Sequence, residues 1–340
     1  MSSDASLYSH KRHGLYLLMY VDDLLLVGER QAVDNAKKEL INLYKMTDLR
    51  AAKRFLGISI DRRHNGANSK VTIHQKPYIE GLLRRYEHDN CNPVSTPMIP
   101  GTKLSRKDDE SKSLVGKEIT WYKQLVGSLM YIMVATRPDL AYTMSRLSKF
   151  FDSPTEEHAI AAKRVLRYLK GTTGKGITYT PSTKKSFAGY SDSDFAGDSD
   201  DRKSTGGYVF LLFGGAISWK SKKQALPALS TVEAEYIAGA EATKEAIWLL
   251  RLLRDLDANV HNAPPATIHF DNQGAMALTK NDANHNRTKH IDVKWHFIRA
   301  YVDNGTVRIT YLPTANMVAD ILTKALPKER HWQHANAMGM

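Results

Sequence analysis

The feature that most constrains this chain is the stretch of residues 187–239, which predicts a strand, a hairpin and a long helix in succession. Alternating residues up to Asp192 and Asp194 predict a strand with both acids on one face. Residues 205–219 then predict two apolar strands joined at a Gly-Gly pair, which is a strong hairpin signal. The stretch therefore predicts a sheet that carries carboxylates near the end of its first strand.

A long helical pattern follows the hairpin. Ser230 or Thr231 is its expected N-cap, and acidic residues, Glu235 among them, lie near its start. Mg²⁺ prefers hard oxygen ligands, and phosphoryl-transfer sites collect such ligands from separate elements. A strand acid and a helix acid together therefore predict half of a metal site.

The later sequence supplies the other half. Residues 266–270 predict a buried strand that ends at Asp271 and is followed directly by a helix. Residues 307–312 predict another strand, followed by a turn and by a helix from about Asn316 that carries Asp320. All four acids lie at strand ends or early in helices, where sites of α/β proteins form. Any one of them alone is more simply a solvated surface acid.

The charge of the chain favours a polyanionic partner. Its 340 residues suggest two or three units, and the net charge is +12. Residues 1–185 carry 31 Lys+Arg against 19 Asp+Glu, whereas residues 186–340 carry 17 against 17. Solvated helix faces explain about half of this excess. Phosphate contacts better suit the basic clusters at 62–63, 84–85, 163–170 and 184–185.

Cysteine content and hydropathy limit the cellular compartments in which the chain is expected. The single cysteine, Cys91, excludes an internal disulfide framework and fits a reducing environment. No apolar run approaches the roughly 20 residues of a membrane span, and the N-terminus lacks a signal-peptide pattern. We therefore expect an ordinary globular chain that is neither secreted nor bound to a membrane.

Three further segments have a clear pattern. LYLLMYVDDLLLVGE predicts a β-hairpin with Asp22 and Asp23 at its tip, although an Asp-rich turn is commonplace. Residues 90–113, rich in Pro, Ser, Thr, Lys and Asp, predict a linker. Residues 121–171 predict helices, with Pro138 at the first position of one of them.

Seven ordered words between residues 186 and 326 are GYSDSDFAGD, RKSTGGYVF, GGAISWKSKKQ, LSTVEAEYIA, HFDNQGA, RTKHIDVKWHFIR and YLPTANMVADILTKAL. They resemble the ribonuclease H domain of copia-type LTR retrotransposon Pol polyproteins. YVDDLLLVG resembles the palm hairpin of reverse transcriptases, and KRFLGISIDR and NPVSTPM continue the likeness. The resemblance covers almost the whole chain.

The resemblance implies a catalytic and metal-binding set of Asp192, Glu235, Asp271 and Asp320. Asp192 is favoured as the first acid over Asp194, which faces the same way. The implied activity is endonucleolytic hydrolysis of the RNA strand of RNA–DNA hybrids. It uses two Mg²⁺ ions, with Mn²⁺ as a substitute, and leaves 5′-phosphate and 3′-hydroxyl ends.

The polymerase set is incomplete, because Asp22 and Asp23 match two metal-binding acids and the third has no counterpart. DNA polymerisation by this chain alone is therefore not expected. Substrate binding is predicted for the basic residues Lys163 and Arg167. Arg287 and His290 belong to a shared word and are predicted to contact the scissile strand, but Thr288 as a helix cap with an exposed His290 fits equally well. Too few ligands surround the histidines to indicate zinc.

The resemblance also implies an α/β (α+β) chain in five parts. They are a truncated palm (1–90), a linker (91–120), a helical thumb and connection region (121–175), a ribonuclease H-like domain with a mixed five-stranded sheet and flanking helices (176–327), and a tail (328–340). Expected partners are RNA–DNA hybrid and a full-length Pol protein acting in trans. The expected location is the cytoplasm, in virus-like particles, or the nucleus.

Three alternatives stay open. In the first, the chain is an inert relic that binds nucleic acid. In the second, it is a fragment that does not fold alone, because its hairpin has lost its sheet partners. In the third, it is an integrase- or resolvase-like nuclease. Glu235 early in the long helix favours ribonuclease H over the last of these.

Overall fold

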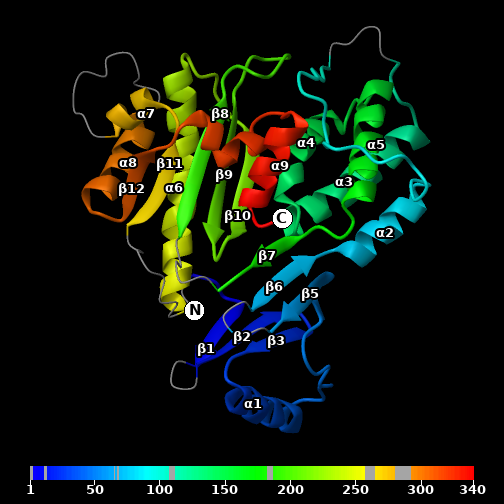
Figure 1. The fold of residues 1–340 in the computed structure, drawn as a ribbon, viewed down its shortest axis with the longest axis vertical. Coiled ribbons are helices and arrows are strands. Elements are labelled where there is room, and N and C mark those ends of the chain that lie inside the picture. Colours follow the sequence, from blue (N-terminus) through cyan, green and yellow to red (C-terminus); the bar gives the residue numbers. More distant parts are fainter. Residues whose placement is uncertain are drawn as a thin grey trace.

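The fold combines helices and strands in a mixed α/β arrangement (Figure 1). The computed structural model describes residues 3–10, 14–64, 66, 69–106, 112–181, 187–256, 265–279 and 292–340. In this part of the chain the strands form three sheets. No helix in the described ranges combines the length and the apolarity that a membrane span requires.

The N-terminal sheet consists of β1 (Leu7–His10), β2 (Leu15–Tyr20) and β3 (Asp23–Val27), all antiparallel, followed by α1 (Arg30–Leu43). The predicted hairpin is confirmed, with Asp22 in its turn. None of the described residues before Gln75 is buried. This sheet therefore has no closed core of its own among the described residues, and it contacts the rest of the protein at the end of a distant helix, where Tyr16 donates a hydrogen bond to the Leu256 carbonyl.

The helical module contains α2 (Lys76–Arg85), α3 (Lys117–Ala135), α4 (Ala141–Leu147) and α5 (Glu156–Gly171). Two short 3₁₀ helices flank α4: η3 (Pro138–Leu140), which starts at the expected proline, and η4 (Ser148–Phe150). The helices pack around one apolar core. Thr155 caps α5 in a capping box with His158, which fixes where this helix starts.

A second sheet connects distant parts of the chain. Its strands are β4 (Arg54–Phe55), β5 (Ile58–Arg63), β6 (Lys70–His74) and β7 (Ile177–Tyr179), in that order and antiparallel. β7 follows α5 in the sequence, so residues on both sides of the helical module lie in one sheet.

The segment predicted as a linker packs against the helical module. Met98, Leu104 and Leu114 are buried in its core, and α3 already begins at Lys117. These three residues are isolated among polar neighbours, so the sequence pattern alone does not predict that they are buried. The predicted tail contains α9 (Lys328–Ala337), which has buried residues.

The third sheet is the expected mixed five-stranded sheet, in the order β10-β9-β8-β11-β12. β8 (Ala188–Asp194), β9 (Thr205–Leu212) and β10 (Gly215–Lys223) are antiparallel neighbours. β11 (Ala266–Phe270) runs parallel to both β8 and β12 (Val307–Tyr311). The helices of this part are α6 (Thr231–Asp255), α7 (Gln273–Leu278) and α8 (Asp292–Asp303).

Helix α6 lies close against this sheet. Ser230 caps it as predicted, by accepting a hydrogen bond from the Glu233 amide. A Cβ atom on Gly239 would lie 2.2 Å from the Phe270 ring, so the helix can approach β11 only because this residue has no side chain. The opposite face is covered by residues of η7 (Val318–Leu322), α4 and α9, which share an apolar core with β9 and β10.

The expected helix from Asn316 is replaced by two 3₁₀ turns, η6 (Thr314–Asn316) and η7. Met317 separates them, since its backbone is extended (φ −70°, ψ 100°) and interrupts the helical hydrogen bonds. Asp320 therefore lies in a short tight turn and not on a regular helix.

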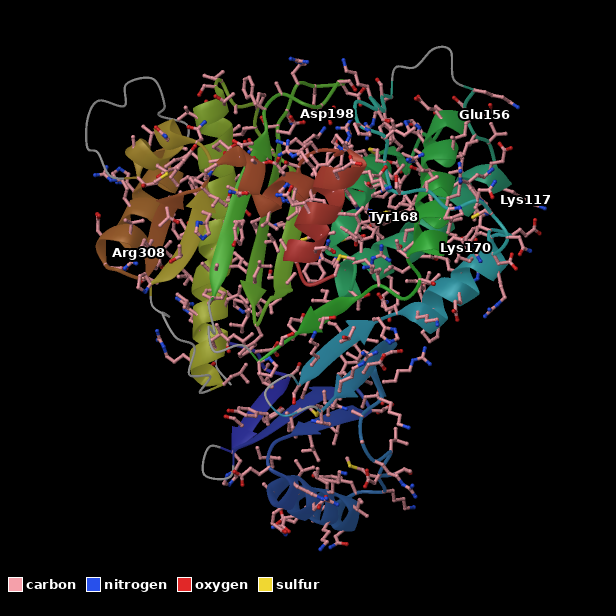
Figure 2. All side chains as sticks on the ribbon, viewed as in Figure 1. Lys117, Glu156, Tyr168, Lys170, Asp198 and Arg308 are labelled. Carbon is pink, nitrogen blue, oxygen red and sulfur yellow. The ribbon has the colours of Figure 1, made fainter. Side chains whose placement is uncertain are left out.

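Buried ion pairs join the helical module to the third sheet. Asp198, in the loop after β8, is fully buried and accepts hydrogen bonds from Arg146 (3.0 Å) and Lys149. Figure 2 shows Asp198 at the junction between the two parts. A second buried network joins Asp139 to Tyr168 (2.6 Å), whose hydroxyl also lies 2.9 Å from His331 Nε2 of α9. The third sheet, the helical module and α9 are thus joined by buried polar contacts.

Candidate active site

Two acids meet at one edge of the five-stranded sheet. In the parallel pair β8 and β11, Tyr190 lies opposite His269. Two residues further along each strand come Asp192 and Asp271. Because parallel strands end at the same edge, this register brings their carboxylates together.

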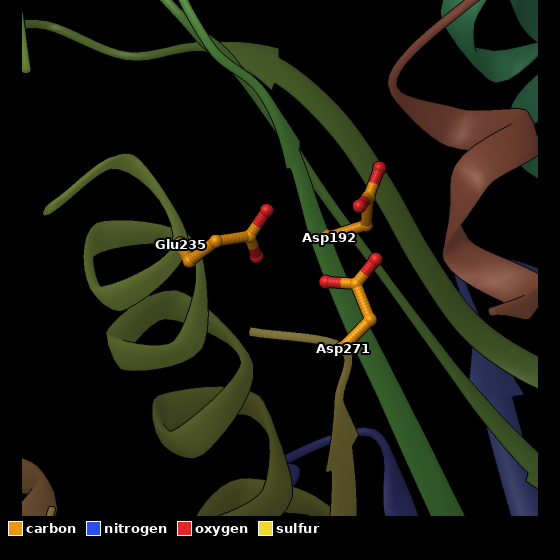
Figure 3. Close-up of side chains that lie close together, drawn as sticks. All are labelled: Asp192, Glu235 and Asp271. Carbon is orange, nitrogen blue, oxygen red and sulfur yellow. The ribbon is translucent and has the colours of Figure 1, made fainter. Parts of the chain in front are cut away.

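Glu235 completes the group from the first turns of α6. Its Oε1 accepts a hydrogen bond from the Ser193 amide at 3.1 Å. Ligand atoms of Asp192, Glu235 and Asp271 all lie within 4.8 Å of one another (Figure 3). Asp192 and Glu235 are buried, and Asp271 is half-buried. The structure therefore brings together three of the four predicted acids, from a strand, a helix and a strand end.

Burial and mutual repulsion keep protons on this cluster. Burial, together with the charges of Asp192 and Asp271, raises the pKa of Glu235 to about 9. Burial also raises the pKa of Asp192 to about 7, against the opposing charge of Lys324. Near neutral pH the cluster without a bound cation therefore retains protons, because it concentrates more negative charge than its surroundings compensate.

The three acids fit a divalent cation. Carboxylate oxygens are the hard ligands that Mg²⁺ and Mn²⁺ prefer. Glu235 Oε2 is buried and has no hydrogen-bond partner among the described residues. A buried oxygen without a partner is costly, and a cation would satisfy it and the neighbouring carboxylates together.

Asp320 lies beside this group and is paired differently. Its Oδ2 accepts a hydrogen bond from Arg330 Nη2 at 2.6 Å, and its Oδ1 lies 3.0 Å from Lys324 Nζ. Asp194, the alternative first acid, lies outside the three-acid group. Burial raises the pKa of Asp194, and Lys324 and Arg146 oppose that rise. The geometry favours Asp192 as the first acid.

The remaining predicted residues lie elsewhere. Asp22 and Asp23 are exposed at the hairpin. Lys163 lies over the Trp121 ring at 5.3 Å, and Arg167 Nε donates to the Asn92 carbonyl at 2.9 Å. Lys163 is exposed, whereas Arg167 is half-buried and held by the segment after α2. Arg287 and His290 lie outside the described residues.

Sequence reasoning missed the side chains that hold the acids in place. Thr323 donates a hydrogen bond to Asp192, and Thr314 Oγ1 donates to Asp271 at 2.8 Å. Lys324 was detectable in principle, because it follows Asp320 by four residues in the same word. Arg330 gave no signal, since its contact depends on how α9 folds back.

Comparisons with known proteins relate the chain to reverse transcriptases and to transposon proteins. A family described as reverse transcriptase (RNA-dependent DNA polymerase) matches residues 3–100. A retrovirus-related Pol polyprotein from transposon TNT 1-94 of Nicotiana tabacum is 42% identical over 96% of this chain and 24% of its own length. A putative transposon Ty5-1 protein of Saccharomyces cerevisiae is 36% identical over 68% of this chain and 73% of its own length.

The chain therefore belongs to the Pol proteins of retrotransposons. Within them it falls in the copia-type group, whose C-terminal part it resembles. It spans about a quarter of the length of the curated polyproteins it matches. A solved N-terminal ribonuclease H domain from Mycobacterium tuberculosis covers 45% of this chain and 97% of its own, at 12% identity and a TM-score of 0.31. This weak likeness adds nothing to the assignment.

Proposed function

We propose that this chain hydrolyses the RNA strand of RNA–DNA hybrids with divalent cations held by Asp192, Glu235 and Asp271, and with Asp320 as the fourth acid. One observation carries the proposal: the three carboxylates converge from β8, α6 and the end of β11. The order of these elements and acids agrees with the ribonuclease H resemblance of the sequence. The membership in the Pol family gives the nucleic-acid context.

The chain's own residues hold the acids in place. The Ser193 amide fixes one oxygen of Glu235, Thr323 fixes one of Asp192, and Thr314 fixes one of Asp271. These contacts orient the carboxylates before substrate arrives, which reduces the reorganisation that catalysis requires. A bound Mg²⁺ would lower the pKa of a water and stabilise the charge on the leaving oxygen of the phosphodiester.

Substrate recognition is proposed to rest on the backbone and sugars of the hybrid. Ribonucleotide 2′-hydroxyls accessible across a shallow minor groove distinguish RNA from DNA. The exposed amine of Lys163 remains a candidate for phosphate contact, and Arg167 a weaker one because its Nε already serves the Asn92 carbonyl. The proposed place of action is inside the cell, in virus-like particles of the cytoplasm or in the nucleus.

The test is cleavage of a labelled RNA–DNA hybrid by the full chain in Mg²⁺. The full chain is required because Asp198, in the loop after β8 of the five-stranded sheet, forms buried ion pairs with Arg146 and Lys149 of the helical module. Asp271→Asn should abolish cleavage, whereas Asp303→Asn, the same change at an exposed acid of α8, should leave it intact. Products should carry 5′-phosphate and 3′-hydroxyl ends. Equal cleavage by the parent and Asp271→Asn would contradict the assigned site.

The alternative is a catalytically inert relic that binds nucleic acid. For the polymerase part, the structure favours this alternative. Among the described residues the only group of acids that could hold a metal ion is the one around Asp192, and it does not include Asp22 or Asp23. A relic would bind hybrid with steep salt dependence and leave it uncut. A folded parent that behaves in this way would establish the relic and exclude the nuclease.

A longer Pol chain acting in trans is proposed as a further partner. The N-terminal sheet leaves apolar side chains exposed, including Val21 (81%) and Val27 (52%). Such a surface fits a protein partner better than it fits water.

A further inference from the structure

Lys324 lies between Asp192 and Asp320, two of the four acids of the proposed site. Its Nζ is 3.0 Å from Asp320 Oδ1 and 3.9 Å from Asp192 Oδ2. Both carboxylates are buried, and the lysine side chain is 35% exposed. One ammonium group thus offsets repulsion between two buried negative charges.

Arg330 completes this arrangement from a separate element. Its Nη2 donates to Asp320 Oδ2 at 2.6 Å and to the Thr314 carbonyl at 3.4 Å. Arg330 belongs to α9, which packs against η7. Both oxygens of Asp320 therefore face cationic side chains that the protein itself supplies.

Glu235 and Asp271 are arranged in the opposite way. Among the described residues neither acid forms an ion pair with a Lys or Arg side chain, whereas Asp320 forms ion pairs with Lys324 and Arg330. The site is therefore asymmetric: one side lacks positive charge, and the side at Asp320 already has it.

On the basis of the proposed nuclease function, we propose that Lys324 is a built-in cation for Asp192 and Asp320, which a second divalent ion has to displace. The three-acid group then binds a first ion directly. A second ion binds only when Lys324 and Arg330 release Asp320. Both basic residues are positioning residues, because they act through Asp320.

The test measures Mn²⁺ binding to the full chain without nucleic acid, by calorimetry and by electron paramagnetic resonance. The parent should bind one ion well and a second one weakly. Lys324→Met removes the charge and keeps the length, and it should tighten the second ion by about tenfold or more. Lys324→Arg should keep the parental behaviour, as should Lys328→Met, a control at an exposed lysine of α9.

The outcomes separate this inference from the proposed function. An unchanged or weaker second ion in Lys324→Met overturns the role of Lys324, even if the chain cleaves hybrid. If the Asp192→Asn variant binds Mn²⁺ as tightly as the parent does, the assigned metal site is wrong and the proposed function fails. Should Lys324→Met not fold, Arg330→Met tests the same idea: the second ion should bind more tightly, and an unchanged affinity overturns it.

Discussion

Replacing Glu235 by Gln should change how the stability of the cation-free chain depends on pH. The pKa of Glu235 is raised by burial to about 9, from an ordinary value of 4.5. The folded state thus holds a proton that the unfolded state releases above about pH 4.5. Stability contributed by this group is complete below that pH and is lost as the pH rises towards 9.

The magnitude follows from the number of retained protons. Asp192, with a pKa of about 7, has largely lost its proton above that pH. Between pH 7 and 9 the folded cluster then keeps about one proton more than the unfolded chain, which costs about 1.4 kcal/mol per pH unit. The parent should therefore lose about 2 kcal/mol across this interval relative to Glu235→Gln, which has no proton to lose at this position.

The assay is urea denaturation in EDTA at pH 7, 8 and 9. Glu241→Gln, on the same helix, is the matched control. Burial favours a higher pKa for Glu241, but a hydrogen bond and the charge from Lys244 outweigh it and lower the pKa. This group is ionised in both states above pH 7, so its variant should run parallel to the parent.

Mg²⁺ should reverse the effect in the parent, because a bound cation favours the ionised carboxylates. Parallel profiles for the parent and Glu235→Gln in EDTA would refute the reasoning, since they would mean that the folded cluster holds no extra proton.

Two further perturbations test the packing that supports the site. Asp198→Ala leaves Arg146 and Lys149 without their buried partner and should cost about 3–5 kcal/mol of unfolding free energy in urea; a loss below about 1 kcal/mol would show that the junction is not a buried ion pair. Gly239→Ala forces a methyl group onto the Phe270 ring and should cost about 1–3 kcal/mol. Gly127→Ala, at an open position within α3, should instead stabilise the chain by about 0.5–1 kcal/mol, and equal effects at both glycines would contradict the close approach of α6 to β11.

The sequence predicted those elements whose signals are local. Alternation, a glycine turn and a serine cap mark β8, the β9–β10 hairpin and the start of α6 within a few residues each. Together with the family resemblance, these signals were enough to nominate the acids and to predict the mixed sheet. Three of the four acids do converge.

The remaining features depend on contacts between distant residues. The extended backbone of Met317 divides the expected helix into two short 3₁₀ turns, and no residue in this part of the sequence predicts that interruption. Arg330 reaches Asp320 only because α9 folds back over η7. Leu104 and Leu114 are buried although their neighbours are polar, because the helices that cover them lie elsewhere in the sequence.

The last residues of the chain form backbone hydrogen bonds with two different sheets. The Thr178 amide of β7 donates to the Gly339 carbonyl at 2.8 Å, and the Ala216 amide of β10 donates to the Met338 carbonyl at 3.0 Å. Met338 is fully buried. A nonsense mutation within the codons of α9 would thus remove these hydrogen bonds while sparing every acid of the site. In an ageing transposon copy, such a lesion should abolish the proposed activity through misfolding and proteolysis, even though an alignment of the four acids would still score as intact.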